Sequence, residues 1–468
     1  MSRVTSVVII GAGPGGYEAA LVAAQLGADV TIIDPHGAGG AAVLTDCVPS
    51  KTLIATADVL SSAADTGELG IRVAGEVAGP GALGVDLAVV NGRVKRLAQA
   101  QSDDIRQRLV SEGIRCVRGR GRLLSAQRVA ATLDDGQVEE FPADVVLLAT
   151  GARPRLLADA MPDGERILTW QQLYDLTEVP PRLIVVGSGV TGAEFASAYH
   201  ALGSQVTLVS SRDHVLPGED PDAAEVIENV FAGRGMTVLE RARAVAARRT
   251  DDGVEVELQD GRVIEGSHVL LAVGSLPNTE DLGLESAGVD TDERGYVTVD
   301  RVSRTSARGV YAAGDCTGVL PLASVAAMQG RIAMWHSLGD AVTPLDLATV
   351  SSTVFTTPEI ATVGVTQREV DAGDARAEVV MLPLATNARA KMQEIQHGFV
   401  KVFCRPTSRI VTGGVVVGPR ASELIHALTV AVDARLTVDQ LAGTFTVYPS
   451  LSGSIAEAAR RLHRSAEA

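Results

Sequence analysis

Short apolar runs alternate with helix-length segments through most of this chain, which is the pattern of stacked strand and helix units. The first run is Val7–Ile10, followed by a glycine-rich turn and an alanine-rich helix from Tyr17 to about Leu26. Further runs at Val30–Ile33 and Val145–Leu148 are typical of strands that are buried on both faces. The pattern predicts an α/β fold built on parallel sheets.

The same order of elements recurs further along the chain. A strand is predicted at Leu183–Val186, a helix opens near Ala193, and further strands are predicted at Gln205–Val209 and before Gly274. The first copy is longer by about the length of a polar, helical stretch at 55–111. Internal duplication of one dinucleotide-binding unit explains this repeat and predicts two different nucleotides on one chain.

Each copy has a glycine turn between its first strand and its first helix. The glycines are Gly11, Gly13 and Gly16 in the first copy, and Gly187, Gly189 and Gly192 in the second. Such glycines permit a tight turn, let a pyrophosphate approach the backbone and let the helix pack closely on the strand. Asp34 and Ser210 follow at the same spacing, each at the end of the next strand. Asp34 is well placed to accept hydrogen bonds from an adenosine ribose.

Composition narrows the function classes. The chain has 468 residues and a formal net charge of −16, so it repels nucleic acid and anionic lipid surfaces. The 4 cysteines follow no repeated spacing, so neither a disulfide scaffold nor a metal site is predicted. No apolar run is long enough for a transmembrane segment. We expect a protein of the reducing cytoplasm without nucleic-acid partners.

Two further stretches carry candidate chemistry. The stretch from Gly39 to Lys51 predicts an apolar helix opened by glycines, with one cysteine, Cys47, and one lysine. A later strand ends in Gly314-Asp315, and an acid at the carboxyl end of a strand can bind a chain of hydroxyl groups. From Ser351 onward, short alternating runs and two helix candidates predict an α+β domain with a sheet available for self-association.

In order and spacing these motifs resemble the flavoprotein disulfide reductases, the family of dihydrolipoamide dehydrogenase and glutathione reductase. The resemblance implies two Rossmann-like dinucleotide-binding domains followed by a C-terminal α+β domain that forms a homodimer. The implied bounds are an FAD-binding domain at 1–155 with a helical insertion at about 55–111, an NAD(P)-binding domain at 156–275, a segment at 276–346 that completes the FAD domain, and a dimerisation domain at 347–468.

The resemblance also implies site residues. Those for FAD are Gly11, Gly13, Gly16, Asp34, Gly40, Ala41, Lys51, Gly121, Thr150, Gly151, Asp315 and Ala323. Those for the nicotinamide nucleotide are Gly187, Gly189, Gly192, Glu194, Ser210, Arg212 and Gly274. Lys51 and Glu194 match the family's ion pair beside the flavin, where a cation favours electron-rich flavin. An interdomain salt bridge without a catalytic role would be the same contact.

The chain departs from the family in its thiol chemistry. Members carry two cysteines in the glycine-opened helix, and here those positions hold Ala42 and Cys47. They also carry a C-terminal histidine and glutamate that move protons for the thiols, and here Tyr448 and Gly453 stand in those places. A tyrosine is a poor base near neutral pH. Cys47 either tunes the flavin as a thiolate or serves as a small apolar residue.

This set of losses resembles the actinobacterial lipoamide-dehydrogenase-like NAD(P)H:quinone reductases that lack the redox disulfide. It implies hydride transfer from NAD(P)H to FAD and then to a quinone, with Lys51, Glu194, Cys47 and Tyr448 at the catalytic centre. A soluble pyridine-nucleotide transhydrogenase and a non-catalytic FAD-binding or regulatory protein remain alternatives.

The choice between NADH and NADPH is left open by the sequence. The uncharged Ser210 removes repulsion against a 2′-phosphate, while the two arginines of glutathione reductases are replaced by Ser211 and Pro217. Arg212 alone offers charge at this position. We expect both NADPH and NADH to serve.

Overall fold

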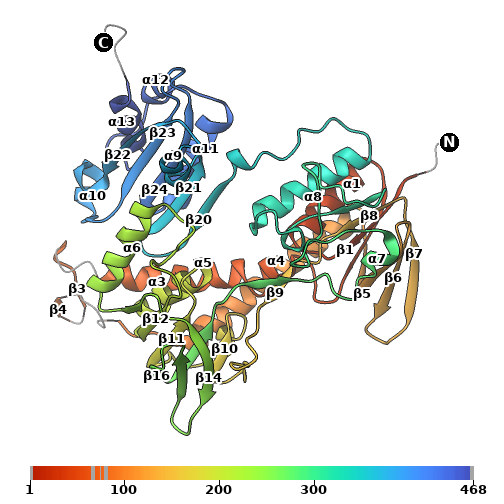
Figure 1. Cartoon of the computed structure of the whole chain (residues 1–468), viewed down its shortest axis with the longest axis horizontal. Helices are drawn as coiled ribbons and strands as arrows, with labels where there is room; N and C mark the ends of the chain where they lie inside the picture. The colour runs from red at the N-terminus through yellow and green to blue at the C-terminus, as the bar shows by residue number, and fades with distance from the viewer. Residues whose placement is uncertain (1–3, 65–68, 74, 78–82, 464–468) are drawn as a thin grey trace. The chain divides into compact units, whose positions relative to one another are not determined.

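The computed structural model describes residues 4–64, 69–73, 75–77 and 83–463. The chain forms two compact units, each assembled from separate stretches of sequence: residues 1–53, 88–155 and 274–346 in the first, and residues 54–87, 156–273 and 347–468 in the second. Figure 1 shows the helices and strands of both. The predicted α/β class is confirmed, and the four predicted domain bounds stay a prediction.

A seven-stranded sheet forms the centre of the first unit, in the order β19-β8-β1-β2-β5-β6-β7. The pairs β19/β8, β8/β1, β1/β2 and β2/β5 are parallel, and β5, β6 and β7 form an antiparallel meander. The carboxyl ends of the parallel strands therefore share one edge. The bounds are β1 Ser6–Ile10, β2 Asp29–Asp34, β5 Arg115–Ser125, β6 Arg128–Leu133, β7 Val138–Pro142, β8 Val145–Leu148 and β19 Val310–Ala312.

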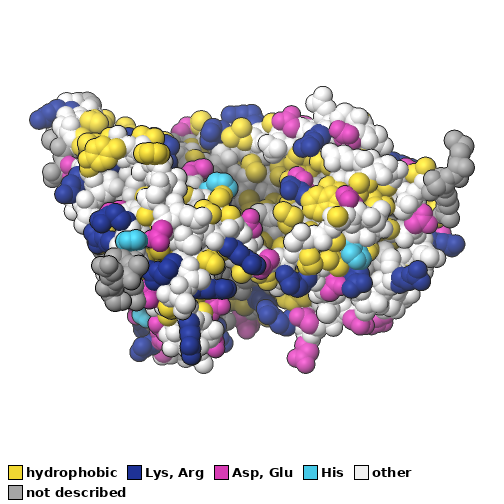
Figure 2. Space-filling model, turned by 90° about the horizontal axis from the view of Figure 1, so that it is seen from above, with side chains coloured by type: hydrophobic (Ala, Val, Ile, Leu, Met, Phe, Trp, Pro, Cys, Tyr) yellow, Lys and Arg dark blue, Asp and Glu magenta, His cyan; other side chains and the backbone are white. Residues whose placement is uncertain are grey.

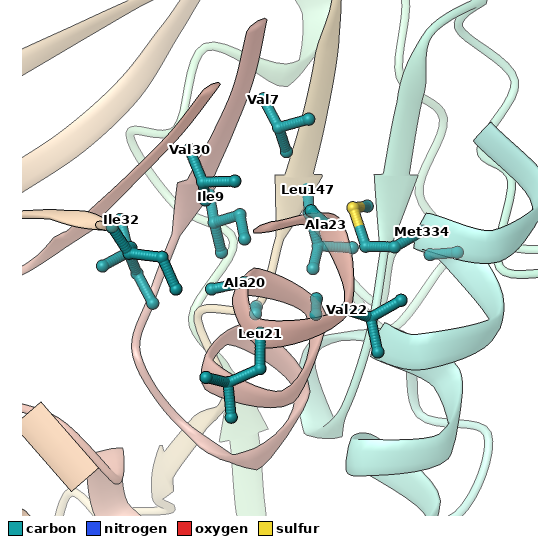
Figure 3. Packing of buried hydrophobic residues seen from close by; sticks show 14 of the residues in the cluster. Val7, Ile9, Ala20, Leu21, Val22, Ala23, Val30, Ile32, Leu147 and Met334 are labelled. Carbon is teal, nitrogen blue, oxygen red and sulfur yellow. The ribbon is translucent and has the colours of Figure 1, made fainter. Parts of the chain in front are cut away.

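Two helices, α1 (Pro14–Gln25) and α8 (Ala323–Ser337), pack against each other and against this sheet. Figure 3 shows how side chains from the strands and both helices meet in one apolar cluster. Burial of each large aliphatic side chain there contributes about 1.5–3 kcal/mol. Its members include Val7, Ile9, Ala20, Val22, Val30, Ile32, Leu147 and Met334.

The close approach of α1 and α8 depends on a glycine. A Cβ atom at Gly330 in α8 would lie 2.0 Å from the carbonyl oxygen of Gly15 in α1. No side chain fits in that space, so the helix that follows the Asp315 strand is held directly against the helix of the first glycine turn.

The second unit contains a five-stranded parallel sheet in the order β10-β17-β11-β12-β13. Its strands are β10 Ile167–Thr169, β11 Arg182–Val186, β12 Gln205–Val209, β13 Thr237–Leu239 and β17 His268–Leu271, with helices α5 Val190–Ala201 and α6 Pro221–Gly233. A separate antiparallel sheet is formed by β14 Ala244–Arg249, β15 Val254–Leu258 and β16 Val263–Gly266.

The last third of the chain, also in the second unit, forms an antiparallel sheet in the order β20-β21-β24-β23-β22. Its core includes Val400, Val402, Val416, Ile425, Leu428 and Ile455. The bounds are β20 Ser351–Val354, β21 Glu359–Gly364, β22 Glu378–Pro383, β23 Phe399–Cys404 and β24 Val411–Gly418, with helices α9 Gln367–Ala372, α10 Ala388–Met392, α11 Ala421–Asp433, α12 Val438–Ala442 and α13 Gly453–Arg461.

The remaining elements are short or connect the sheets. They are α2 Gly40–Leu44, α3 Cys47–Ala64, β3 Arg72–Val73, β4 Glu76–Val77, α4 Leu87–Ser111, β9 Ala152–Pro154, β18 Ser275–Pro277 and α7 Leu284–Ala287. Short 3-10 turns lie at Leu173–Asp175, Asp315–Thr317, Leu347–Thr349 and Leu384–Thr386. None of the helices in the described part of the chain has the length and apolar character needed to span a bilayer.

The face in view in Figure 2 carries basic and acidic side chains interspersed with one another. Neither sign of charge forms a continuous field on that face. This face therefore offers no extended basic surface for a polyanion, and the net charge of −16 disfavours such binding as well.

The helix predicted from Gly39 to Lys51 is divided in the structure into two helices, α2 and α3. The carbonyl oxygen of Ala41 accepts hydrogen bonds from the backbone N–H groups of both Thr45 (3.0 Å) and Asp46 (2.8 Å). The second bond spans five residues and widens the turn, so α2 ends there and α3 starts afresh at Cys47.

A buried lysine connects β23 to the start of α6. Lys401 is 1% exposed, and its Nζ lies 2.8 Å and 2.9 Å from the two carboxylate oxygens of Asp220 and also contacts Asp222. Asp220 is itself buried and caps α6 by accepting from the N–H groups of Asp222 and Ala223. Because Lys401 and Asp220 are both buried away from water, the charge of each is stabilised mainly by the opposite charge of the other.

Replacing Lys401 by methionine will therefore destabilise the protein strongly. The Lys401→Met variant leaves the buried carboxylate of Asp220 without its cation, a change that costs about 3–5 kcal/mol. The measurement is the urea concentration at the unfolding midpoint of the FAD-loaded protein. The control is the exposed Lys391→Met in α10, which we expect to shift stability by about 0.5 kcal/mol or less. Equal midpoints for the two variants would contradict the prediction.

Candidate cofactor and nucleotide sites

The first glycine turn is forced by contacts of the chain with itself. Gly11 has a φ of 103°, and a Cβ atom there would lie 2.2 Å from the carbonyl oxygen of Ala149. A Cβ atom at Gly16 would lie 1.9 Å from the carbonyl oxygen of Gly11. Gly13 is different, because a Cβ atom there would meet no atom of the described residues within 4 Å. Gly13 therefore faces open space at the start of α1, as a backbone that receives a pyrophosphate requires.

Asp34 at the end of β2 organises the loops around this turn. One carboxylate oxygen accepts from the N–H of Ala12 (2.8 Å), and the other accepts from His36 (2.7 Å) and Gly37 (2.9 Å). The carboxylate is thus held in one orientation at the edge where the parallel strands end. Its predicted role toward a ribose stays a prediction.

The start of α2 lies against the same turn. The N–H of Gly39 donates to the carbonyl oxygen of Ala12 (2.8 Å), and a Cβ atom at Gly40 would lie 2.7 Å from the Cα of Gly13. Gly39 and Gly40 therefore lie directly against the glycine turn. The roles of Gly40 and Ala41 toward a cofactor stay predictions.

The turn after β8 is braced by a distant segment. Thr150 Oγ1 donates to the carbonyl oxygen of Asn278 (2.7 Å), and Asn278 Nδ2 donates to the carbonyl oxygen of Thr150 (2.9 Å). The N–H of Asn278 also donates to the carbonyl oxygen of Gly151 (3.0 Å). Gly121 in β5 packs on the side chain of Ile10, where a Cβ atom would lie 2.9 Å away.

Asp315 lies at the end of β19, on the same edge as the glycine turn. No donor within the described residues reaches its carboxylate, and burial raises its pKa. The adjacent Gly314 N–H donates to the buried Gln329 of α8 (2.8 Å), the helix that begins at Ala323. A half-buried carboxylate without protein donors fits a ligand that brings hydroxyl groups. Together with the open Gly13, this edge of the sheet fits FAD.

Cys47 and Lys51 lie one helical turn apart at the start of α3. Both are partly buried, and Ala42 in α2 supplies no second sulfur. The four cysteines of the chain form no disulfide. Thiol–disulfide exchange by two cysteines on this helix pair is therefore not available to the protein.

The second glycine turn repeats the first in detail. A Cβ atom at Gly187 would lie 2.2 Å from the carbonyl oxygen of Ala272, and one at Gly192 would lie 1.8 Å from the carbonyl oxygen of Gly187. A Cβ atom at Gly189 would again meet nothing within 4 Å in the described part of the chain. The repeat of two required glycines and one open glycine supports a second dinucleotide at the start of α5.

Glu194 in α5 is 3% exposed, and its carboxylate accepts a hydrogen bond from the N–H of Phe355 (2.9 Å). One turn later, Ser197 Oγ accepts from the N–H of Thr357 (3.1 Å), and Thr357 Oγ1 donates to Asp58 (2.9 Å). Burial raises the pKa of Asp58, although the hydrogen bond from Thr357 lowers it. The N–H of Phe355 therefore orients one carboxylate oxygen of Glu194, a role that the sequence alone did not suggest.

Lys51 belongs to the first compact unit and Glu194 to the second. Their pairing beside a flavin, which the family resemblance implies, stays a prediction. Gly274, implied as a nucleotide-binding residue, lies at the start of the last stretch of the first unit, where its carbonyl oxygen accepts from the N–H of Arg155 (2.9 Å).

Ser210 lies at the end of β12 and is fully buried. Its hydroxyl is 2.7 Å from that of Ser188, contacts the carbonyl oxygen of Arg212 (3.2 Å) and accepts from the N–H of Arg212 (3.1 Å). The hydroxyl of Ser210 therefore already has hydrogen-bond partners within the chain. Direct contacts of Ser210 and Arg212 with a nucleotide stay predictions. The Ser188–Ser210 contact joins residues on different elements, and nothing in the sequence pattern indicated it.

Tyr448 and Gly453 lie in the C-terminal part of the second unit. Tyr448 is 86% exposed and Gly453 begins α13. The loop between them is held by Asn387, whose amide donates to the carbonyl oxygen of Ser450 (3.0 Å) and to Ser454 Oγ (2.8 Å). Neither Tyr448 nor Gly453 supplies the histidine–glutamate proton relay of the disulfide reductases.

Comparison with known proteins gives a consistent picture. Residues 5–330 match the sequence profile described as pyridine nucleotide-disulphide oxidoreductase, and residues 350–459 match the profile of its dimerisation domain. A protein of Mycobacterium tuberculosis named NAD(P)H dehydrogenase (quinone) is 58% identical, over 98% of this chain and 94% of that protein. Dihydrolipoyl dehydrogenase of Chlamydia pneumoniae is 33% identical, over 98% and 97%.

The crystal structure of LpdA from Mycobacterium tuberculosis matches this chain with a TM-score of 0.94 and 57% sequence identity. The match covers 98% of this chain and 100% of that chain. The predicted architecture of a glutathione-reductase-like α/β fold with a C-terminal dimerisation domain is thereby confirmed.

The open space at Gly13 leads to a test of the first site. In the Gly13→Ala variant the added methyl group meets no protein atom, so the chain will fold, but it occupies the space that a pyrophosphate needs. We expect FAD to bind about tenfold or more weakly, measured by fluorescence titration of the apoprotein. The comparison variant is Gly16→Ala, which clashes with backbone and will lower stability itself. Full FAD affinity in Gly13→Ala would refute the assignment of this turn.

Proposed function

Because this chain belongs to the pyridine nucleotide-disulphide oxidoreductase family, we propose that it is an FAD-dependent NAD(P)H dehydrogenase that reduces a quinone. The observation that carries the proposal is the pair Ala42 and Cys47, with one sulfur where disulfide exchange needs two. Tyr448 and Gly453 support it, because the proton relay for thiols is also missing. A relative with 58% identity is named for the same reaction.

FAD, when bound, would supply the hydride acceptor and the means to pass electrons to the quinone. The chain contributes the binding groups. Gly13 and the N–H groups at the start of α1 would receive the pyrophosphate, and Asp34 would bind the adenosine ribose. Asp315 would accept hydrogen bonds from hydroxyl groups of the cofactor, since it lacks donors from the described part of the chain.

A nicotinamide nucleotide would bind at the second glycine turn, with its pyrophosphate over Gly189. Lys51 and Glu194 would form an ion pair that keeps the lysine charged and near the redox centre. The hydrogen bond from Phe355 to Glu194 would hold one carboxylate oxygen of that pair in place. We propose that both NADH and NADPH serve as donors.

We further propose that the protein acts as a homodimer. An exposed apolar stretch supports this, because Phe445 is 102% exposed, Val447 is 77% exposed and Tyr448 is 86% exposed. Several exposed apolar side chains on one short segment are typical of protein interfaces. They lie within residues 350–459, which match the dimerisation profile. A cytoplasmic location stays a prediction from the sequence.

The choice of acceptor tests the proposal. We expect rapid NADPH oxidation with a naphthoquinone under anaerobic conditions, and no reduction of NAD with dihydrolipoamide, because Ala42 and Tyr448 remove the thiol chemistry. Steady-state absorbance assays measure both. Faster turnover with thio-NAD than with the quinone would favour a transhydrogenase. Failure of NADPH to bleach the bound flavin would instead favour a non-catalytic FAD-binding protein.

The role of Lys51 is tested by removing its charge. The Lys51→Met variant should reduce its flavin with NADPH about tenfold or more slowly than the wild type, because a fixed cation no longer stabilises developing negative charge. Stopped-flow absorbance under anaerobic conditions measures the limiting rate. The Lys51→Arg variant keeps the charge and should recover part of that rate. An unchanged rate in Lys51→Met would reduce Lys51 to a structural role.

A further inference from the structure

Two arginines lie on neighbouring loops at the edge of the second nucleotide site. Arg212 follows β12 and Arg241 follows β13, and these strands pair in parallel. The N–H of Arg241 donates to the carbonyl oxygen of Arg212 (3.0 Å), and the N–H of Ala242 donates to that of Ser210 (2.7 Å). The two loops therefore run side by side just beyond the strand end that a dinucleotide fold uses for the adenosine ribose.

The strand end itself carries no charge. Ser210 is fully buried, and its hydroxyl is engaged by Ser188 and by the backbone of Arg212 and His214. An acid at this position would repel a 2′-phosphate, whereas Ser210 leaves the approach neutral. Discrimination between NADH and NADPH must then come from groups next to Ser210.

The charged side chains of these two loops differ in whether they form ion pairs or hydrogen bonds within the chain. Among the described residues, no carboxylate pairs with the exposed guanidinium of Arg212. The Arg241 side chain, 79% exposed, is held by Asp213 with an Nε–Oδ1 distance of 2.6 Å. Glu228 points inward, where it accepts from the N–H of Val215 (2.6 Å). Glu240, the neighbour of Arg241 in the sequence, is also exposed, but the carboxylate that pairs with the Arg241 guanidinium is Asp213. Asp213 therefore competes directly for this cation.

The backbone fixes where Arg241 stands. Its φ of 51° lies in the left-handed region, which non-glycine residues rarely adopt, and its N–H is anchored to Arg212. Its side chain is long and mostly exposed, so it can exchange one anionic partner for another without movement of the sheet.

We propose that Arg212 and Arg241 together bind the 2′-phosphate of NADPH, and that Asp213 competes with this phosphate for Arg241. This inference rests on the proposed function, since it requires a nicotinamide nucleotide at the second glycine turn. NADPH gains two cations but must break the Arg241–Asp213 ion pair, whereas NADH binds with the pair intact. The competition keeps the preference between the two nucleotides small.

The test compares two probes that differ by one phosphate, adenosine 2′,5′-bisphosphate and 5′-AMP, by calorimetry on the FAD-loaded protein. Arg241→Gln should weaken the bisphosphate about tenfold and leave 5′-AMP unchanged. Asp213→Asn should tighten the bisphosphate by about threefold to tenfold, because Arg241 is released from its partner. A variant that only damaged the fold could not produce this gain.

The matched control is Asp260→Asn, which breaks another exposed pair of the same unit, with Arg262 at 2.8 Å. It should change neither affinity. In anaerobic flavin reduction, Arg241→Gln should raise the NADPH concentration needed for half-maximal rate and leave the limiting rate unchanged, because the 2′ position is remote from the hydride.

The outcomes separate the two proposals. If neither probe binds the wild-type protein and neither nucleotide reduces its flavin, the proposed function fails. If both nucleotides reduce the flavin but the bisphosphate affinity is the same in wild type, Arg241→Gln and Asp213→Asn, the 2′-phosphate assignment alone is overturned. Loss of affinity for both probes in Arg241→Gln would also overturn it, because the arginine would then serve the whole nucleotide.

Discussion

Backbone contact at the two glycine turns is the constraint on which the rest of the structure depends. Gly16 and Gly192 each bring a helix so close to its turn that a Cβ atom would lie 1.9 Å and 1.8 Å from a carbonyl oxygen. Each helix therefore starts at the edge where the parallel strands end. The free N–H groups of its first turn face the position that a phosphate group would occupy. Asp34 and Asp315, the other groups proposed to bind the cofactor in the first unit, lie at the ends of strands of the same sheet.

The proposed chemistry depends on which groups these two turns and their neighbouring segments contain and which they lack. Both turns leave one glycine facing open space, which supports the proposal that each turn binds a dinucleotide. The helix pair beside the first turn carries Cys47 without a second sulfur, and the segment at Tyr448 carries no proton relay. A fold that keeps its nucleotide sites but cannot exchange thiols is suited to passing electrons directly from a flavin to a small acceptor.

Polar groups far apart in sequence orient the candidate site. Glu194 takes its hydrogen bond from Phe355, and Thr150 is braced by Asn278. Each contact joins residues more than one hundred positions apart, so no local pattern could reveal it. The same holds for the hydrogen bond from Arg241 to Arg212, which forms because β13 pairs with β12. The break between α2 and α3 could not be read from the sequence either, because a carbonyl oxygen that accepts two hydrogen bonds does not change the spacing of apolar residues.

The sequence by itself determined the duplicated α/β plan, both glycine turns and the loss of the second thiol. These depend on local spacing, on the restricted conformations that only glycine adopts and on the identity of single residues. Only the tertiary structure decided which glycines are required by packing and which face open space, and which charges meet around the site. Those properties arise from contacts between strands and loops distant in sequence, and such contacts exist only once the sheets have formed.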